Sequence, residues 1–250
     1  MQKYNDTKKK PVFYKFLRKI VSIFYRKRTI ENKEYLSKKP AIYVSNHAQM
    51  HGPLSNEMYF PKKKYIWCIG DVMKTKEAAK YNYQDFWSKK PLYIRWFFKL
   101  ASYLTAPLSA YVFSRADTIA VYKDKRLATT FKDSIRALEN GCDIIIFPES
   151  KDKYNHIVNE FQTGYIDLAR LYYKKNHECI DFIPVYNAPK LKKMVLGKPI
   201  TFDPNINIDI EKELISSYLK EEITDLALNQ PLHKVLPYDN VGKKNYPYNK

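Results

Sequence analysis

The chain has 250 residues, which is long enough for one large domain with a substantial core and does not require two. Its 44 Lys and Arg against 26 Asp and Glu give a formal net charge of +18, which favours an anionic partner such as nucleic acid, a membrane surface or a phosphorylated small molecule. The cysteines Cys68, Cys142 and Cys179 are odd in number and form no Cys-x-x-Cys pattern, which disfavours a disulfide framework and a zinc site and favours a reduced, cytosolic setting.

Residues 11–28 have the pattern of a basic amphipathic helix. Apolar side chains recur there at helical spacing, at Phe13, Phe16, Leu17, Ile20 and Phe24. Basic side chains surround them, at Lys15, Arg18, Lys19, Arg26, Lys27 and Arg28. Such a helix suits an anchor at an anionic membrane surface, and it suits equally well a helix that packs its stripe on the core. We expect residues 1–35 to form a separate membrane-interfacial segment, with packing on the core as the alternative.

The next apolar run, residues 41–45, ends at Asn46 and His47 and is followed by Gly52 and Pro53. This pattern predicts a strand, a tight loop and then a helix with Pro53 at its first position. His47 would then lie at the carboxyl end of a strand, which is where open α/β sheets bind ligands. Near the positive end of the next helix its imidazole is expected to stay neutral, so it is a candidate general base.

The most apolar part of the chain lies at residues 92–113, where Arg95, Lys99 and Pro107 interrupt it. Its uninterrupted part is shorter than the ~20 residues that a membrane span requires. We therefore expect a helical hairpin or broken helix that is buried or dips into a lipid surface, with plain core helices as an equally strong alternative. Between the first strand and this part we expect a helix, a strand and a helix, at 54–59, 65–69 and 74–80.

From residue 118 onward, predicted strands and helices alternate regularly. The strands are expected at 118–122, 142–147, 180–186 and 194–196, and the helices at 124–138, 164–174 and 208–228. This order predicts an α/β fold in which a mixed, mostly parallel sheet is flanked by helices. The α/β domain is expected to span residues 36–230, and the tail at 231–250 is expected to wrap the surface or to be disordered.

Three reactive side chains follow predicted strands directly: His47, Lys123 and Glu149. If these strands are parallel, all three side chains project from the same edge of the sheet. A neutral base, a cation and a carboxylate would then converge on one crevice. This combination suits activation of a hydroxyl on a substrate that also carries a phosphate.

Four short blocks resemble, in the same order, those of the glycerolphosphate and lysophosphatidate acyltransferases. They are Asn46-His47 before a helix, Ile119 to Lys123, Phe147-Pro148-Glu149-Ser150 with Phe161-x-x-Gly164, and Ile183-Pro184-Val185 with Leu196 to Ile200. The resemblance covers roughly residues 40–200 and implies an acyltransferase-like fold. It also implies transfer of a fatty-acyl group from coenzyme A or acyl carrier protein to a hydroxyl of a phosphate-bearing lipid, of the lysophosphatidate or glycerol 3-phosphate type. The co-substrate thioester is then the acyl donor, and neither a cofactor nor a metal is expected.

The resemblance implies a role for each matching residue. His47 is the base that deprotonates the acceptor hydroxyl, Glu149 helps to position the acceptor, and Lys123 holds its phosphate. Further substrate contacts are implied at Asn46, Arg126, Pro148, Ser150 and Gly164. The family also implies a peripheral or monotopic protein on the cytoplasmic face of the cell membrane.

Two positions depart from the family pattern. Lys123 stands where the family usually has Arg, which keeps the charge but loses the bidentate fork. Gly52 stands where the first block, His-x-x-x-x-Asp, has its Asp. In serine-protease triads, loss of the orienting carboxylate costs about four decades in rate because the imidazole is held in the wrong tautomer. A substitute orienter is therefore expected, and the candidates are His51, Glu57, Asp71 and a backbone carbonyl.

Other interpretations remain open. Without the Asp, His47 fits a structural histidine in a catalytically impaired protein of the same fold that binds phospholipid or an acyl carrier. The pair His47 and His51 has a spacing compatible with zinc, but no third ligand is suitably placed. Nucleic acid is disfavoured as a partner, because no recognisable binding motif accompanies the positive charge.

Overall fold

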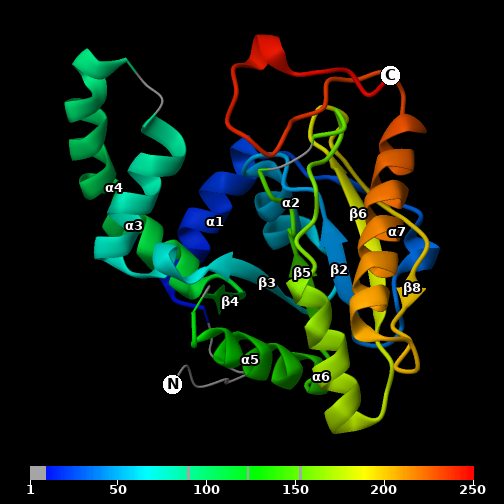
Figure 1. The fold of residues 1–250 in the computed structure, drawn as a ribbon. Coiled ribbons are helices and arrows are strands. Elements are labelled where there is room, and N and C mark those ends of the chain that lie inside the picture. Colours follow the sequence, from blue (N-terminus) through cyan, green and yellow to red (C-terminus); the bar gives the residue numbers. More distant parts are fainter. Residues whose placement is uncertain (1–9, 89–90, 123, 152–153) are drawn as a thin grey trace. The chain divides into compact units, whose positions relative to one another are not determined.

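The computed structural model describes residues 10–88, 91–122, 124–151 and 154–250 (Figure 1). The chain divides into two compact units. The smaller unit comprises residues 1–25 and 67–133, and the larger comprises residues 26–66 and 134–250. Strand β3 (Lys64–Ile69) and helix α5 (Leu127–Glu139) each run through the boundary between them.

The larger unit is built on a mixed, mostly parallel sheet. Its strands are β1 (Thr29–Glu31), β2 (Ile42–Ser45), β5 (Asp143–Ile146), β6 (Asp181–Ala188), β7 (Lys193–Leu196) and β8 (Ile200–Thr201). The strand order is β1-β7-β6-β2-β5-β3, and β8 pairs with β6. Strand β2 is parallel to both of its neighbours, whereas β7 and β8 are antiparallel to β6. The predicted fold class is therefore confirmed.

Helices α2 (His51–Tyr59), α6 (Asp167–Asn176) and α7 (Ile208–Leu228) complete this unit, and α7 packs on β6. All four residues of β2 and all four of β5 are buried, which explains why both strands are continuously apolar or nearly so. Tyr43, Ile145 and Ile183 from three adjacent strands belong to one core cluster. Helix α7 begins where Asn207 accepts a hydrogen bond from the Asp209 N–H, a side-chain N-cap.

The smaller unit is mainly helical. It holds α1 (Val12–Phe24), α3 (Thr75–Asn82), α4 (Arg95–Arg115) and strand β4 (Thr118–Val121), which pairs with β3. Helices α3 and α4 pack through small side chains, Ala78, Ala79, Ala106 and Ala110. Helix α1 contacts α4 through the rings of Phe13 and Tyr111, whose centroids are 5.5 Å apart.

The structure corrects two predictions about helices, one for α4 and one for α2. Helix α4 continues through Pro107, so the hairpin or broken helix expected within residues 92–113 is not formed. Proline costs this helix one hydrogen bond, and the packing of Ala106 and Ala110 on α3 offsets that loss. Helix α2 begins at His51, so Pro53 occupies its third position, where a missing N–H is still harmless. None of the helices among the described residues combines the length and the apolar character needed to cross a membrane.

The tail at residues 231–250 packs on the larger unit (Figure 1, red). The Asn249 side chain donates to the Ala227 carbonyl at the end of α7, at 2.7 Å, and accepts from the His233 N–H at 2.9 Å. The Val235 N–H donates to the Pro247 carbonyl at 2.8 Å. Of the two alternatives left open by the sequence, the tail adopts the ordered one.

Candidate active site

The parallel arrangement of β2 and β5 brings His47 and Glu149 together. Both residues follow the carboxyl ends of their strands. The His47 backbone N–H donates to Glu149 Oε2 at 2.5 Å, and the Asn159 backbone N–H donates to Oε1 at 3.1 Å. One carboxylate thus ties the loop after β2 to a segment of the chain beyond β5.

Glu149 is buried, with only 5% of the residue exposed. Burial raises its pKa to about 7, although the two N–H donors lower the pKa and so oppose this effect. Both oxygens are engaged with the protein's own main chain, so the visible action of Glu149 is to hold the His47 loop. Its role in positioning an acceptor stays a prediction.

Asn46 is likewise engaged within the fold. Its side-chain oxygen accepts from the Asn187 backbone N–H at 2.6 Å, and its side-chain amide donates to the Asn187 carbonyl at 3.1 Å. Ser45 Oγ donates to the Val185 carbonyl at 3.0 Å. These buried bonds join the end of β2 to β6 and fix the residue that precedes His47. Asn187 could not be predicted from the sequence, because no motif links it to Asn46.

The His47 imidazole is held on several sides. Its Nδ1 is hydrogen-bonded to the Gln49 backbone carbonyl. The rings of Phe147 and Tyr238 lie edge-on to it, with centroid distances of 5.3 and 5.2 Å. Burial lowers the pKa of His47 below its ordinary value. A neutral ring that donates from Nδ1 carries its lone pair on Nε2, so Nε2 is the nitrogen that can accept a proton.

The conformation of the following loop directs the Gln49 carbonyl toward the ring. Ala48 and Gln49 have φ angles of 45° and 58°, in the left-handed region that non-glycine residues adopt at a cost. The Gly52 N–H then donates to the His47 carbonyl at 2.9 Å. A Cβ at position 52 would lie 2.5 Å from the Asn46 carbonyl oxygen and 2.6 Å from that of His47. This backbone therefore cannot hold an Asp at position 52.

The three side chains proposed as orienters are not the Nδ1 partner of His47. Glu57 forms an ion pair with Lys64 at 3.0 Å. His51 opens α2, and burial together with nearby cations lowers its pKa. Asp71 belongs to the smaller unit. The partner is a backbone carbonyl, which was the remaining alternative, and it belongs to Gln49.

Three of the other predicted residues lie in the larger unit. Pro148 accepts from the Gln162 N–H at 2.9 Å through its carbonyl, and the Ser150 N–H donates to the Glu160 carbonyl at 2.8 Å. Gly164 begins a 3₁₀ turn, and a Cβ added there would have no atom within 4 Å. These contacts define the loop after β5, and the substrate roles of the three residues stay predictions.

Of the two predicted cations, the structure describes only Arg126. Arg126, in the smaller unit, donates to the Asp124 carboxylate at 2.7 Å and stacks over Tyr122, 3.8 Å from the ring centroid. The Asp124 carboxylate holds the pKa of this guanidinium above its usual value. Lys123, the predicted phosphate contact, lies outside the described residues.

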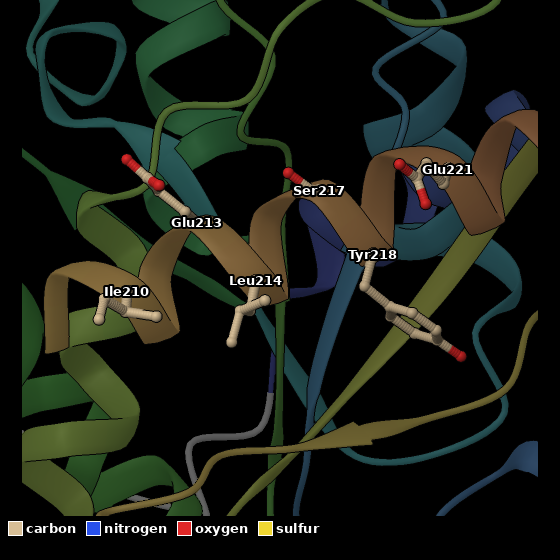
Figure 2. Close-up of a pocket in the computed structure, with 6 residues that line it drawn as sticks. All are labelled: Ile210, Glu213, Leu214, Ser217, Tyr218 and Glu221. Atoms are coloured by element: carbon tan, nitrogen blue, oxygen red, sulfur yellow. The ribbon is translucent and has the colours of Figure 1, made fainter. Parts of the chain in front are cut away.

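A pocket on helix α7 does not coincide with this site. A shallow pocket is lined entirely by side chains of α7 (Figure 2), namely Ile210, Glu213, Leu214, Ser217, Tyr218 and Glu221. None of these was predicted as a site residue. Among the described residues, no group of three or more His, Cys, Asp or Glu side chains is arranged to hold a metal ion.

Comparison with known proteins found similarity among solved structures only. No family model matches the chain, and no curated protein matches it. Among solved structures, the chain is similar to the 1-acyl-sn-glycerophosphate (LPA) acyltransferase PlsC from Thermotoga maritima. The two are 14% identical, the TM-score is 0.44, and the match covers 83% of this chain and 80% of that one.

Proposed function

We propose that this protein is an O-acyltransferase of the glycerolipid type. It moves a fatty-acyl group from acyl-coenzyme A or acyl carrier protein to the hydroxyl of a phosphate-bearing lipid acceptor, such as lysophosphatidate or glycerol 3-phosphate. The observation that supports this proposal most strongly is the protonation state of His47. Its Nδ1 is bonded to a carbonyl and burial lowers its pKa, so at neutral pH the ring is uncharged and Nε2 is the proton acceptor.

The proposed step needs only this base and the two substrates. Nε2 of His47 takes the proton of the acceptor hydroxyl while that oxygen attacks the thioester carbonyl carbon, which forms the new C–O bond. The C–S bond then breaks, and the imidazolium returns the proton to the leaving thiolate. The products are an ester and a free thiol. Glu149 supports the step through the His47 backbone N–H, which keeps the base in place.

The proposal includes a membrane surface as partner and the cytoplasmic face as location. Two helices of the smaller unit support the membrane surface as partner, because both leave apolar side chains exposed. On α1 these include Phe16 and Phe24, and on α4 they include Trp96, Phe97 and Leu104. Exposed apolar faces beside basic residues suit interfacial binding. Lys123 is proposed as the contact for the acceptor phosphate.

A second candidate is a non-catalytic protein of the same fold that binds phospholipid or an acyl carrier. The absence of the family's Asp favours it, since Gly52 stands at that position. The two candidates differ in one respect, which is whether His47 takes a proton.

The test is acyl transfer by the purified protein with acyl-coenzyme A and lysophosphatidate in mixed micelles. His47→Ala is expected to lower the rate by about 10²- to 10⁴-fold, the usual contribution of a general base. His177→Asn is the control, because His177 is an exposed residue with a φ of 56° that Asn tolerates. Lys123→Ala should mainly raise KM for the phosphorylated acceptor.

The pH profile adds a second readout. The base must be unprotonated, and the pKa of His47 lies below its ordinary 6.5. The rate should therefore fall as the pH is lowered, with the midpoint of the decline below pH 6.5. Normal turnover by His47→Ala would contradict the mechanism. Lipid binding without any turnover by the unmodified protein would favour the second candidate.

A further inference from the structure

The C-terminal segment, residues 231–250, is hydrogen-bonded to the side chain of Gln49, whose backbone carbonyl is bonded to the His47 ring. Tyr246 donates its hydroxyl hydrogen to Gln49 Oε1 at 3.2 Å. Gln49 Nε2 in turn donates to the Asp239 backbone carbonyl at 3.3 Å. Both ends of one side-chain amide are therefore bound by a segment that lies almost 200 positions later in the chain, as the separations of 190 and 197 residues show.

Apolar packing supports the same contact. Ala48, Leu236 and Tyr246 form a buried cluster, so the loop and the C-terminal segment share a small core. Tyr238 from the same segment lies against the His47 ring. The loop is thus covered by this segment as well as hydrogen-bonded to it.

The segment is itself fixed to the larger unit at its two ends. His233 Nε2 is hydrogen-bonded to the buried Tyr186 hydroxyl of β6 at 2.8 Å. Asn249 caps the end of α7 through the Ala227 and Gln230 carbonyls, at 2.7 and 3.2 Å. Since these anchors do not involve the His47 loop, the segment provides a rigid frame against which Gln49 is held.

We propose that Gln49 is the positioning residue of the base and that the C-terminal segment fixes it through Tyr246 and Asp239. This inference rests on the proposed role of His47. The same residue provides both the carbonyl that accepts from Nδ1 and the amide that is clamped. A φ of 58° is unfavourable for glutamine, so the loop needs outside contacts to keep the carbonyl aimed at the ring. The clamp replaces the carboxylate for which position 52 has no room.

Tyr246→Phe tests the clamp, because it removes one hydroxyl and keeps the ring in its cluster. We expect kcat to fall about fivefold, the effect of one neutral hydrogen bond, with KM for both substrates unchanged. Tyr248→Phe is the matched control, since it removes a hydroxyl from the same segment at a ring that is 51% exposed. It should leave kcat unchanged.

A second variant tests whether the loss of kcat in Tyr246→Phe acts through Gln49. Gln49→Asn shortens the side chain beyond reach of Tyr246, while asparagine tolerates the left-handed φ. If the two residues act as one unit, the double variant with Tyr246→Phe should lose no more activity than Gln49→Asn alone. Additive losses would overturn the coupling.

The tautomer of His47, measured by ¹⁵N NMR of labelled histidine, is a readout that needs no activity. The unmodified protein should carry the proton on Nδ1, and Tyr246→Phe and Gln49→Asn should each raise the share of the Nε2–H form. A proton on Nε2 in the unmodified protein would overturn the proposal, as would unchanged tautomers and unchanged kcat in both variants. A tautomer shift in a protein that transfers no acyl group would uphold the positioning role and refute the proposed function.

Discussion

The main chain around Gly52 leaves no room for a side chain. A Cβ there would meet two backbone carbonyl oxygens at 2.5 and 2.6 Å, and backbone atoms cannot turn away as a flexible side chain can. Gly52→Ala should therefore lower the free energy of unfolding by about 1–3 kcal/mol, measured by urea denaturation. Gly164→Ala is the control, because nothing lies within 4 Å of its added Cβ, and it should change stability by less than about 0.5 kcal/mol.

The same geometry predicts the behaviour of Gly52→Asp, which would complete the His-x-x-x-x-Asp pattern of the acyltransferases that the sequence resembles. A carboxylate placed there must first displace the carbonyls of Asn46 and His47, so it should destabilise the loop instead of orienting the imidazole. We expect acyl transfer to fall relative to the unmodified protein. A folded Gly52→Asp variant with higher activity would mean that the loop rearranges and that Gln49 is dispensable.

At the level of single residues, only part of the site could be predicted from the sequence. The positions of His47 and Glu149 follow from where two buried strands end, and the structure brings these residues into contact. The orienting carbonyl was left as one of several alternatives. Its direction depends on left-handed φ angles at Ala48 and Gln49, and neither residue type signals such a conformation. Contacts from residues 231–250 were also missed, because that segment has no periodic pattern.

Elements were easier to predict than contacts. Helix α7 spans the predicted residues 208–228, and the alternation of strands and helices correctly indicated a mostly parallel sheet. The start of helix α2 and the course of helix α4 were exceptions, and α4 was predicted wrongly because Pro107 is a strong local signal for a break. Tertiary packing overrides it here, since Ala106 and Ala110 allow α4 to lie close to α3.

The exposed face of α4 leads to a prediction about membrane binding. Leu100 and Leu104 are 53% and 73% exposed, so their side chains are available to a lipid surface. Changing both to Ser should weaken binding to vesicles by about tenfold or more, since each loses much of the ~1.5–3 kcal/mol that burial of a leucine contributes. Co-sedimentation with vesicles measures this.

A matched pair on another helix provides the control. Ile210 and Leu214 lie on α7 (Figure 2). They are 56% and 51% exposed, against 53% and 73% for Leu100 and Leu104. Their replacement by Ser changes surface hydrophobicity by a similar amount. Vesicle binding should stay the same in this variant. An equal loss in both double variants would show that exposed apolar area in general, and not the α4 face, determines binding.

The charge of the whole molecule leads to the last prediction. A net charge of +18 attracts any anionic surface, and each cation near an acidic membrane contributes about 1 kcal/mol. Screening shortens the reach of these charges from about 10 Å at 0.1 M salt to about 3 Å at 1 M. Binding to vesicles that contain phosphatidylglycerol should therefore weaken steeply as salt rises, and binding to zwitterionic vesicles should be weak at every salt concentration.

Oligonucleotides distinguish this account from general attraction to polyanions. The exposed apolar faces of α1 and α4 can enter a lipid interface, but they gain nothing from a phosphate backbone. At equal salt, a double-stranded oligonucleotide should thus bind more weakly than the anionic vesicles and should not compete with them. If an equimolar amount of oligonucleotide displaced the protein from the vesicles, the positive charge would be shown to bind nucleic acid. Tight binding to zwitterionic vesicles that is independent of salt would show that the apolar faces act without the charge.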